Sequence, residues 1–139
     1  MNALLSSANG TMTQLVRGSS WEAEAYRHAL ALKDLPEEWD GPRKCRKPTV
    51  FAINAAMAFI ERVASLDLVV LEAPFVAPMS HGGVQLEWEH GQRQLDVELT
   101  PDGAARFVVS DAGKVDEGEL GAVTSSDVEA LFGWLAAAP

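Results

Sequence analysis

Strict alternation of apolar and polar residues is the clearest pattern in the chain. It runs along residues 84–89, along 94–99 and again up to residue 110. A period of two is typical of a strand with one buried and one solvated face. We therefore expect an antiparallel sheet with three strands at its centre.

Two tight reversals predict how these strands pair. The first is a two-residue turn at His90-Gly91, and the second is a three-residue loop, Pro101–Gly103, with glycine in the left-handed conformation. The expected pairs are Val84–Val97, Leu86–Leu95, Val97–Phe107 and Leu95–Val109. Both reversals place these apolar residues on the same face, and a slip by one residue would turn them outward.

Apolar residues at helical spacing predict helices on either side of the sheet region. The first helix follows a capping box at 19–22 and ends near Lys33, the second starts at Pro48, and the third starts from a capping box at 126–129. The expected apolar stripes are Trp21, Ala25, His28 and Leu32; Val50, Ile53, Met57, Ile60 and Ala64; and Val128, Leu131, Phe132 and Leu135.

The remaining segments complete a single small domain. Residues 66–79 contain two prolines and are expected to end in an edge strand, where a missing amide is tolerated. An acidic loop is expected after Ser110, with a short strand near 120–123. The prediction is a flexible arm over residues 1–18 and one α+β domain over 19–139. Its antiparallel meander sheet has three to five strands and is covered on one face by two or three helices.

Composition narrows the classes of partner. The 139 residues carry a net charge of −9, which disfavours general binding to nucleic acid or to anionic membranes. The longest apolar run, 50–60, is shorter than the roughly 20 residues of a membrane span, and no export signal is visible. A single cysteine excludes an internal disulfide, so we expect a cytoplasmic protein.

The turn Trp39-Asp40-Gly41 is the first candidate site. The favoured interpretation is structural, with Trp39 as an aromatic anchor, Asp40 capping the turn and Gly41 supplying a positive φ. The alternative is that Trp39 and Asp40 contact a partner.

A basic cluster follows this turn and holds four of the eleven basic residues: Arg43, Lys44, Arg46 and Lys47. Such a loop can bind a phosphate or an acidic partner, or it can simply be solvated. Cys45 lies inside the cluster, where cations favour the thiolate. A nucleophile also needs a base, and no histidine lies nearby in the sequence.

The histidines give no sign of a metal site. His28 falls on an apolar helical stripe, where a buried, hydrogen-bonded core histidine is the favoured interpretation. His81 and His90 lie in turns. This spacing matches no metal-ligand pattern, so no metal and no cofactor are expected.

The solvated face of the predicted sheet is acidic. It carries Glu87, Glu89, Asp96 and Glu98, and Arg106 should lie opposite Glu98. This surface is either simply solvated, or a docking site for a basic protein, or a carboxylate pair for acid–base chemistry. Trp134 lies off the stripe of the last helix, where it either caps the core or anchors a partner.

Two motifs resemble those of a group of short proteins of bacteria and mobile elements. These are Trp39-Asp40-Gly41 and the strand Gly82-Gly83-Val84-Gln85-Leu86-Glu87-Trp88. The resemblance spans about residues 35–103, and the chain departs from it after Gly41, where Pro42 and the basic cluster follow. The group has no assigned activity. The resemblance implies an accessory role in a conflict or regulatory system.

The chain has surfaces but no recognisable reaction centre, so we expect a non-enzymatic protein-interaction or regulatory module. Its binding surface would be the acidic sheet face, the 39–47 loop, or both. One alternative is an inhibitor from a phage or mobile element that mimics nucleic acid with its carboxylates. The other is a small enzyme that uses Cys45 or a carboxylate pair.

Overall fold

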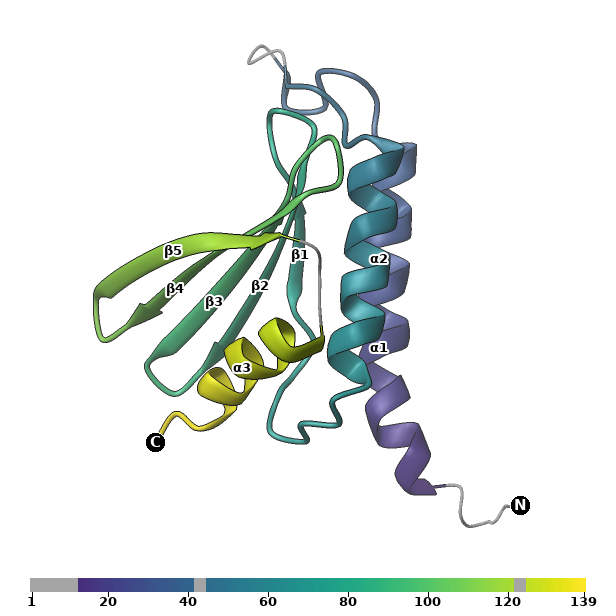
Figure 1. The fold of residues 1–139 in the computed structure, drawn as a ribbon. Coiled ribbons are helices and arrows are strands. Elements are labelled where there is room, and N and C mark those ends of the chain that lie inside the picture. Colours follow the sequence, from purple (N-terminus) through teal and green to yellow (C-terminus); the bar gives the residue numbers. More distant parts are fainter. Residues whose placement is uncertain (1–12, 42–44, 122–124) are drawn as a thin grey trace.

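The computed structural model describes residues 13–41, 45–121 and 125–139. Within these ranges, α-helices and a short 3-10 helix accompany one five-stranded sheet (Figure 1). The elements in chain order are α1 (Thr13–Ala31), η1 (Leu32–Asp34), α2 (Val50–Ala64), β1 (Phe75–Pro78), β2 (Val84–His90), β3 (Arg93–Leu99), β4 (Ala105–Asp111), β5 (Lys114–Gly121) and α3 (Ser125–Ala136).

The predicted fold class is confirmed. The sheet is an antiparallel meander in the order β1-β2-β3-β4-β5, so every strand pairs with its neighbours in the sequence. Both α2 and α3 pack on β2 and β3, while α1 packs on α2 and on β1. We call the helix-covered face the inner face and the opposite one the outer face (Figure 1).

The inner face carries the apolar layer that the alternation predicts. Its central residues are fully buried: Val84, Leu86, Leu95 and Val97. Phe107 and Val109 lie on the same face and are partly buried against this core. The short edge strand after the proline-containing segment is also confirmed, as β1.

The predicted register of the first hairpin is wrong by two residues. Leu86 faces Val97 instead of Leu95, because the turn residues are Gly91-Gln92 and not His90-Gly91. Gly91 has a φ of 61°, and a tight hairpin turn of type II′ requires glycine at its first central position. A shift of two residues keeps every side chain on its predicted face.

The second hairpin pairs as predicted. Leu95 faces Val109 and Val97 faces Phe107. Thr100 and Ala104 close the loop through a backbone hydrogen bond of 2.8 Å, and Gly103 has a φ of 91°.

The helix predictions need three corrections. The first helix begins at Thr13 and not after Ser19, so residues 13–18 of the predicted arm are helical, and residues 1–12 lie outside the described part. His28 is exposed, because α1 turns Ala25 and Ala29 inward and the following η1 buries Leu32.

The second helix is rotated relative to its predicted stripe. Val50 is 55% exposed, and the buried residues are Ala52, Ile53, Ala56, Phe59, Ile60 and Val63. The reason is that α2 packs against both α1 and the sheet, which buries a wider arc than a single contact would. The stripe of α3 is confirmed, with Val128, Phe132 and Leu135 buried and Leu131 partly buried.

The acidic loop expected after Ser110 is largely wrong. β4 continues to Asp111, and the chain returns at once as β5, so the segment is a hairpin with a two-residue turn. The expected strand near 120–123 overlaps only the end of β5, and residues 122–124 lie outside the described part.

Thr49 joins α2 to the sheet and offers a test of this arrangement. Its Oγ1 accepts a hydrogen bond from the Ala52 amide at 3.0 Å and donates one to the Pro101 carbonyl at 2.5 Å. Thr49→Ala should lower the free energy of unfolding by about 1–2 kcal/mol, measured by urea denaturation, because the helix loses its N-cap. Thr49→Ser keeps the hydroxyl and should cost clearly less. An equal loss in both variants would contradict this role.

Candidate functional site

The outer face of the sheet gathers carboxylates from neighbouring strands. Glu87 of β2 lies directly opposite Asp96 of β3, and Glu89 lies one position along the same face. Directly opposite side chains on one face of an antiparallel pair have Cβ atoms about 5 Å apart. The structure therefore brings three of the predicted acidic residues into one cluster.

Arg106 neutralises only one side of this face. Its guanidinium contacts Glu98 at 3.3 Å, as predicted, and also contacts Glu117 of β5 at 3.3 Å. The pairing of β4 with β5 adds Glu117 and Glu119 to the outer face. Sequence reasoning missed both glutamates because it assigned their segment to a loop, although Val115, Glu117 and Glu119 alternate with Asp116 and Gly118 there.

Glu87 is the carboxylate most affected by its surroundings. Burial raises the pKa of the Glu87 carboxyl above its ordinary value, and the negative charges of Asp96 and Glu89 raise it further. Among the described residues, Glu87 has no ion pair, whereas Glu98 has Arg106. The cluster thus holds a charge that no ion pair among the described residues balances at Glu87.

A hollow of ≈ 290 Å³ opens beside Glu87 at the β1 edge. It is lined by Glu72, Ala73, Phe75, Glu87, Trp88 and Glu89. Phe75 is 66% exposed and stands next to the carboxylates, because it pairs with Glu87 across β1 and β2. An aromatic ring among carboxylates suits an incoming lysine or arginine side chain, which carries a cation on an apolar stem.

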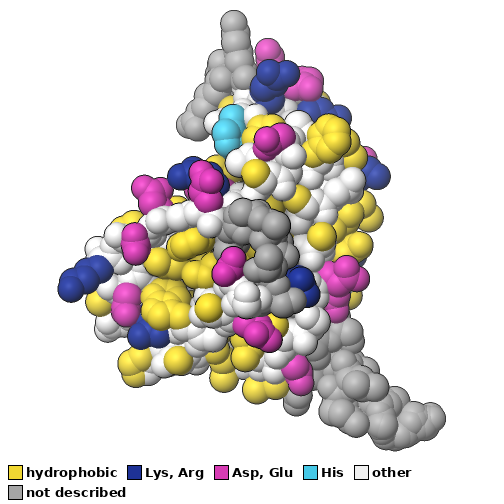
Figure 2. Space-filling model, in the orientation of Figure 1, with side chains coloured by type: hydrophobic (Ala, Val, Ile, Leu, Met, Phe, Trp, Pro, Cys, Tyr) yellow, Lys and Arg dark blue, Asp and Glu magenta, His cyan; other side chains and the backbone are white. Residues whose placement is uncertain are grey.

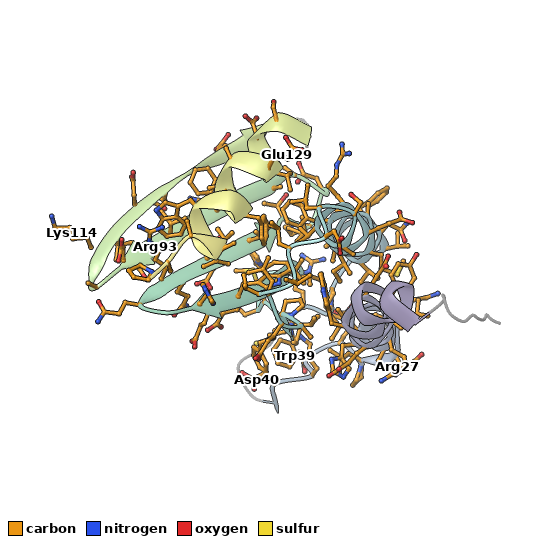
Figure 3. All side chains as sticks on the ribbon, turned by 90° about the horizontal axis from the view of Figure 1, so that it is seen from below. Arg27, Trp39, Asp40, Arg93, Lys114 and Glu129 are labelled. Carbon is orange, nitrogen blue, oxygen red and sulfur yellow. The ribbon has the colours of Figure 1, made fainter. Side chains whose placement is uncertain are left out.

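Residues 39–41 and 45–47 lie at the end of the sheet where β1 connects to β2 (Figure 1), and Figure 3 shows Trp39 and Asp40 from below. Trp39 donates a hydrogen bond from Nε1 to the Arg46 carbonyl at 2.9 Å, and the Arg46 amide donates to the Ser80 carbonyl at 2.9 Å. Gly41 has a φ of 73°. These contacts support the structural interpretation of Trp39 and Gly41, in which the turn anchors the loop to the β1–β2 connection.

A second hollow is lined by basic side chains of the loop, by Lys33 and by the first residues of α2. Arg46, Lys47 and Thr49 form part of its wall, and the Lys47 amide donates to Glu37 Oε1 at 3.2 Å. A carboxylate of the chain itself thus already approaches this hollow. Arg43 and Lys44 lie outside the described residues.

Cys45 is buried, with 3% of its surface exposed. Its thiol donates to Asp40 Oδ2 at 3.7 Å. His28 and His81 are both exposed, and His81 pairs in an isolated bridge with Arg46, the residue after Cys45. The contact gives Asp40 a structural role beside Trp39.

Trp134 is held by Arg93. The Arg93 guanidinium lies 4.8 Å from the centre of the Trp134 ring, and its Nη1 donates to the Trp134 carbonyl at 2.5 Å. Arg93 also forms an ion pair with Asp111 at 3.1 Å. Trp134 is partly buried against the core, so it covers the edge of the core.

A further hollow was not foreseen from the sequence. It has a volume of ≈ 490 Å³ and lies between α1, the end of α2 and the segment that follows α2. Trp21, Glu24, Asp67, Leu68 and Glu72 are part of its lining. It forms only where two helices and a loop meet, which a local pattern does not reveal.

The described residues hold neither a metal-ligand cluster nor a membrane-spanning helix. Among the described residues, no group of three or more His, Cys, Asp or Glu side chains is placed to hold a metal ion. In the same parts of the chain, no helix has the length and apolar character needed to cross a membrane. Comparison of the chain with protein-family models, with curated proteins and with solved structures finds no match in any of the three.

The raised pKa of Glu87 gives a pH-dependent test. Because folding favours the protonated carboxyl, Glu87 weakens the fold as pH rises from below its ordinary pKa through its higher folded pKa. Glu87→Gln should therefore raise the free energy of unfolding at about pH 7, by roughly 0.2–1 kcal/mol, and change it little at about pH 3.5.

Glu129→Gln is the matched control, since Glu129 is exposed on α3 (Figure 3). Urea denaturation of both variants at the two pH values makes the comparison. An equal effect of Glu87→Gln at both pH values would show that burial and the neighbouring charges do not destabilise the ionised Glu87 carboxylate.

Proposed function

We propose that the protein is a non-enzymatic interaction module that docks a basic surface of a partner protein on its outer sheet face. The observation that carries the proposal is the cluster of Glu87, Glu89 and Asp96, where Glu87 has a raised pKa and no ion pair among the described residues. A lysine or arginine of a partner would stabilise the ionised cluster.

The hollow beside Glu87 gives this docking a defined position. A partner's basic side chain could place its stem against Phe75 and its cation between Glu72, Glu87 and Glu89. Contacts of a cation with an aromatic ring contribute about 0.5–1 kcal/mol at exposed sites. Several such contacts, and not the hollow alone, would set the affinity.

The same geometry supports binding over catalysis. Acid–base catalysis by carboxylates is typical of clefts that exclude water, whereas the cluster lies on an open sheet face. Cys45 is buried beside Asp40, which restricts the approach of a substrate to its sulfur. The proposed role is regulatory and the proposed location is the cytoplasm, without direct general binding to nucleic acid.

Charge reversal on the outer face tests the proposal. Glu87→Lys combined with Asp96→Lys should weaken the binding of the partner at least about tenfold, because like charges then face each other across the interface. Proteins captured from the native host with the wild type and with this variant are identified by mass spectrometry, and affinity is then measured with the purified partner at increasing salt.

Two further double variants serve as controls. Glu61→Lys with Glu129→Lys makes the same charge change on exposed helix positions, and should leave binding within about twofold. Arg46→Glu with Lys47→Glu tests the 39–47 loop separately. Capture that is unchanged by the outer-face variant, or lost only with the loop variant, would rule out docking on the outer face.

A further inference from the structure

The two edges of the sheet differ in how well they are protected. β1 has four residues, contains Pro78, follows Pro74 and is contacted by α1. Proline has no amide hydrogen and cannot donate to an added strand. β5 has eight residues and no proline, and among the described elements β4 is its one strand neighbour. In Figure 1, β5 forms the edge on the side away from α1 and α2.

The β4–β5 turn determines which backbone groups of β5 face outward. Ala112 and Gly113 have φ values of 53° and 90°, and positive φ at both central positions is the mark of a type I′ turn. Such a turn is closed by a hydrogen-bonded pair, here Asp111 and Lys114. Since bonded and non-bonded pairs alternate, the amides and carbonyls of Val115 and Glu117 point away from β4.

A side chain already approaches one of these outward amides. The Glu117 amide donates to Asp116 Oδ1 at 2.9 Å. This contact agrees with the outward direction of the Glu117 amide, since a bond to β4 would compete with it. An added strand would replace Asp116 with a backbone carbonyl as the acceptor for this amide.

Charge along β5 indicates the chemistry of an added strand. Glu117 and Glu119 lie on the outer face, which carries no base of this strand. Asp116 and Lys114, the one base of β5, lie on the inner face, opposite Val109 and Asp111. Cross-strand pairs of opposite charge contribute roughly 0.2–1 kcal/mol each. Basic side chains on the outer face of an added strand would match this pattern.

The inner face at the same edge is apolar around Gly118, beyond Asp116 and Lys114. Gly118 has no side chain, and a Cβ there would lie 2.7 Å from Phe107 Cζ, so the Phe107 ring covers the strand. Phe107, Val109, Leu131 and Trp134 are only partly buried. Figure 2 shows hydrophobic side chains gathered beside α3 over this part of the sheet. An apolar side chain opposite Gly118 would extend this layer.

We propose that β5 binds an extended segment of a partner protein as a sixth strand, with basic side chains toward the outer face and apolar ones toward the inner face. Backbone hydrogen bonds to Val115 and Glu117 would hold it, as in other cases of strand addition. A second copy of this chain fits less well, because two β5 strands would bring Asp116, Glu117 and Glu119 of both copies together. This inference goes beyond the proposed docking site, which lies near the opposite edge.

The test uses a defined probe and a matched pair of variants. The probe is an eight-residue peptide in which lysine and valine alternate, with blocked termini. Glu117→Pro removes the outward amide hydrogen, and Glu117→Gln removes the same charge, and so the ion pair with Arg106, but keeps the amide. Binding is measured by fluorescence anisotropy, and thermal unfolding confirms that each variant is folded.

We expect Glu117→Pro to bind the peptide at least about tenfold more weakly than Glu117→Gln. In the wild type, excess peptide should shift the NMR amide signals of Val115 and Glu117, a result that needs no variant. Equal binding by the two variants, or unshifted Val115 and Glu117 signals, would overturn the proposal. Shifts confined to Glu87 and Asp96 would reject the β5 edge while supporting outer-face docking. A wild-type dimer that Glu117→Pro abolishes would identify a second copy as the occupant.

Discussion

Trp88 occupies the point where the sheet meets all three helices, and the rest of the structure depends on its contacts. Its ring centre lies 6.5 Å from that of Trp21 on α1, 6.4 Å from Phe59 on α2 and 4.8 Å from Phe132 on α3. Edge-to-face aromatic pairs contribute about 0.5–1.5 kcal/mol beyond the area they bury. The Trp88 Nε1 group is buried without a hydrogen-bond partner among the described residues, so the packing of this cluster outweighs the loss of one hydrogen bond.

This aromatic cluster also explains why no described helix covers the outer face of the sheet. The described helices all pack on the inner face. Because side chains alternate between the two faces along each strand, Glu87, Asp96 and Glu98 lie on the outer face. Across the sheet, Arg106 bridges Glu98 and Glu117 but does not reach the pair formed by Glu87 and Asp96. The charge imbalance is therefore local, although the whole chain is acidic.

Small residues are buried on α1 and α2, the two helices that pack on each other. Ala25 and Ala29 of α1 are fully buried, as are Ala52 and Ala56 of α2. Small side chains at a helix contact reduce the distance between the axes. The same helices leave β4 and β5 only partly covered, so Phe107 and Val109 stay at the rim of the core. The uncovered edge and the apolar rim beside it are thus consequences of one packing arrangement.

The sequence by itself determined which side chains share a face of the sheet, because alternation along a strand is a local property of the backbone. It also predicted the second hairpin from Gly103, the stripe of α3 and the partnership of Glu98 with Arg106. Local signals for the register at Gly91 and for β5 were present, in the glycine of the turn and in the alternation along 115–119. Only the tertiary structure decided the outward position of His28 and Val50. The position of these two side chains depends on helix packing with residues distant in the sequence, and the raised pKa of Glu87 likewise depends on burial and on Asp96 of the neighbouring strand. Contacts of this kind leave no local pattern, so the acidic face was predictable in outline while its hollow and the open edge of β5 were not.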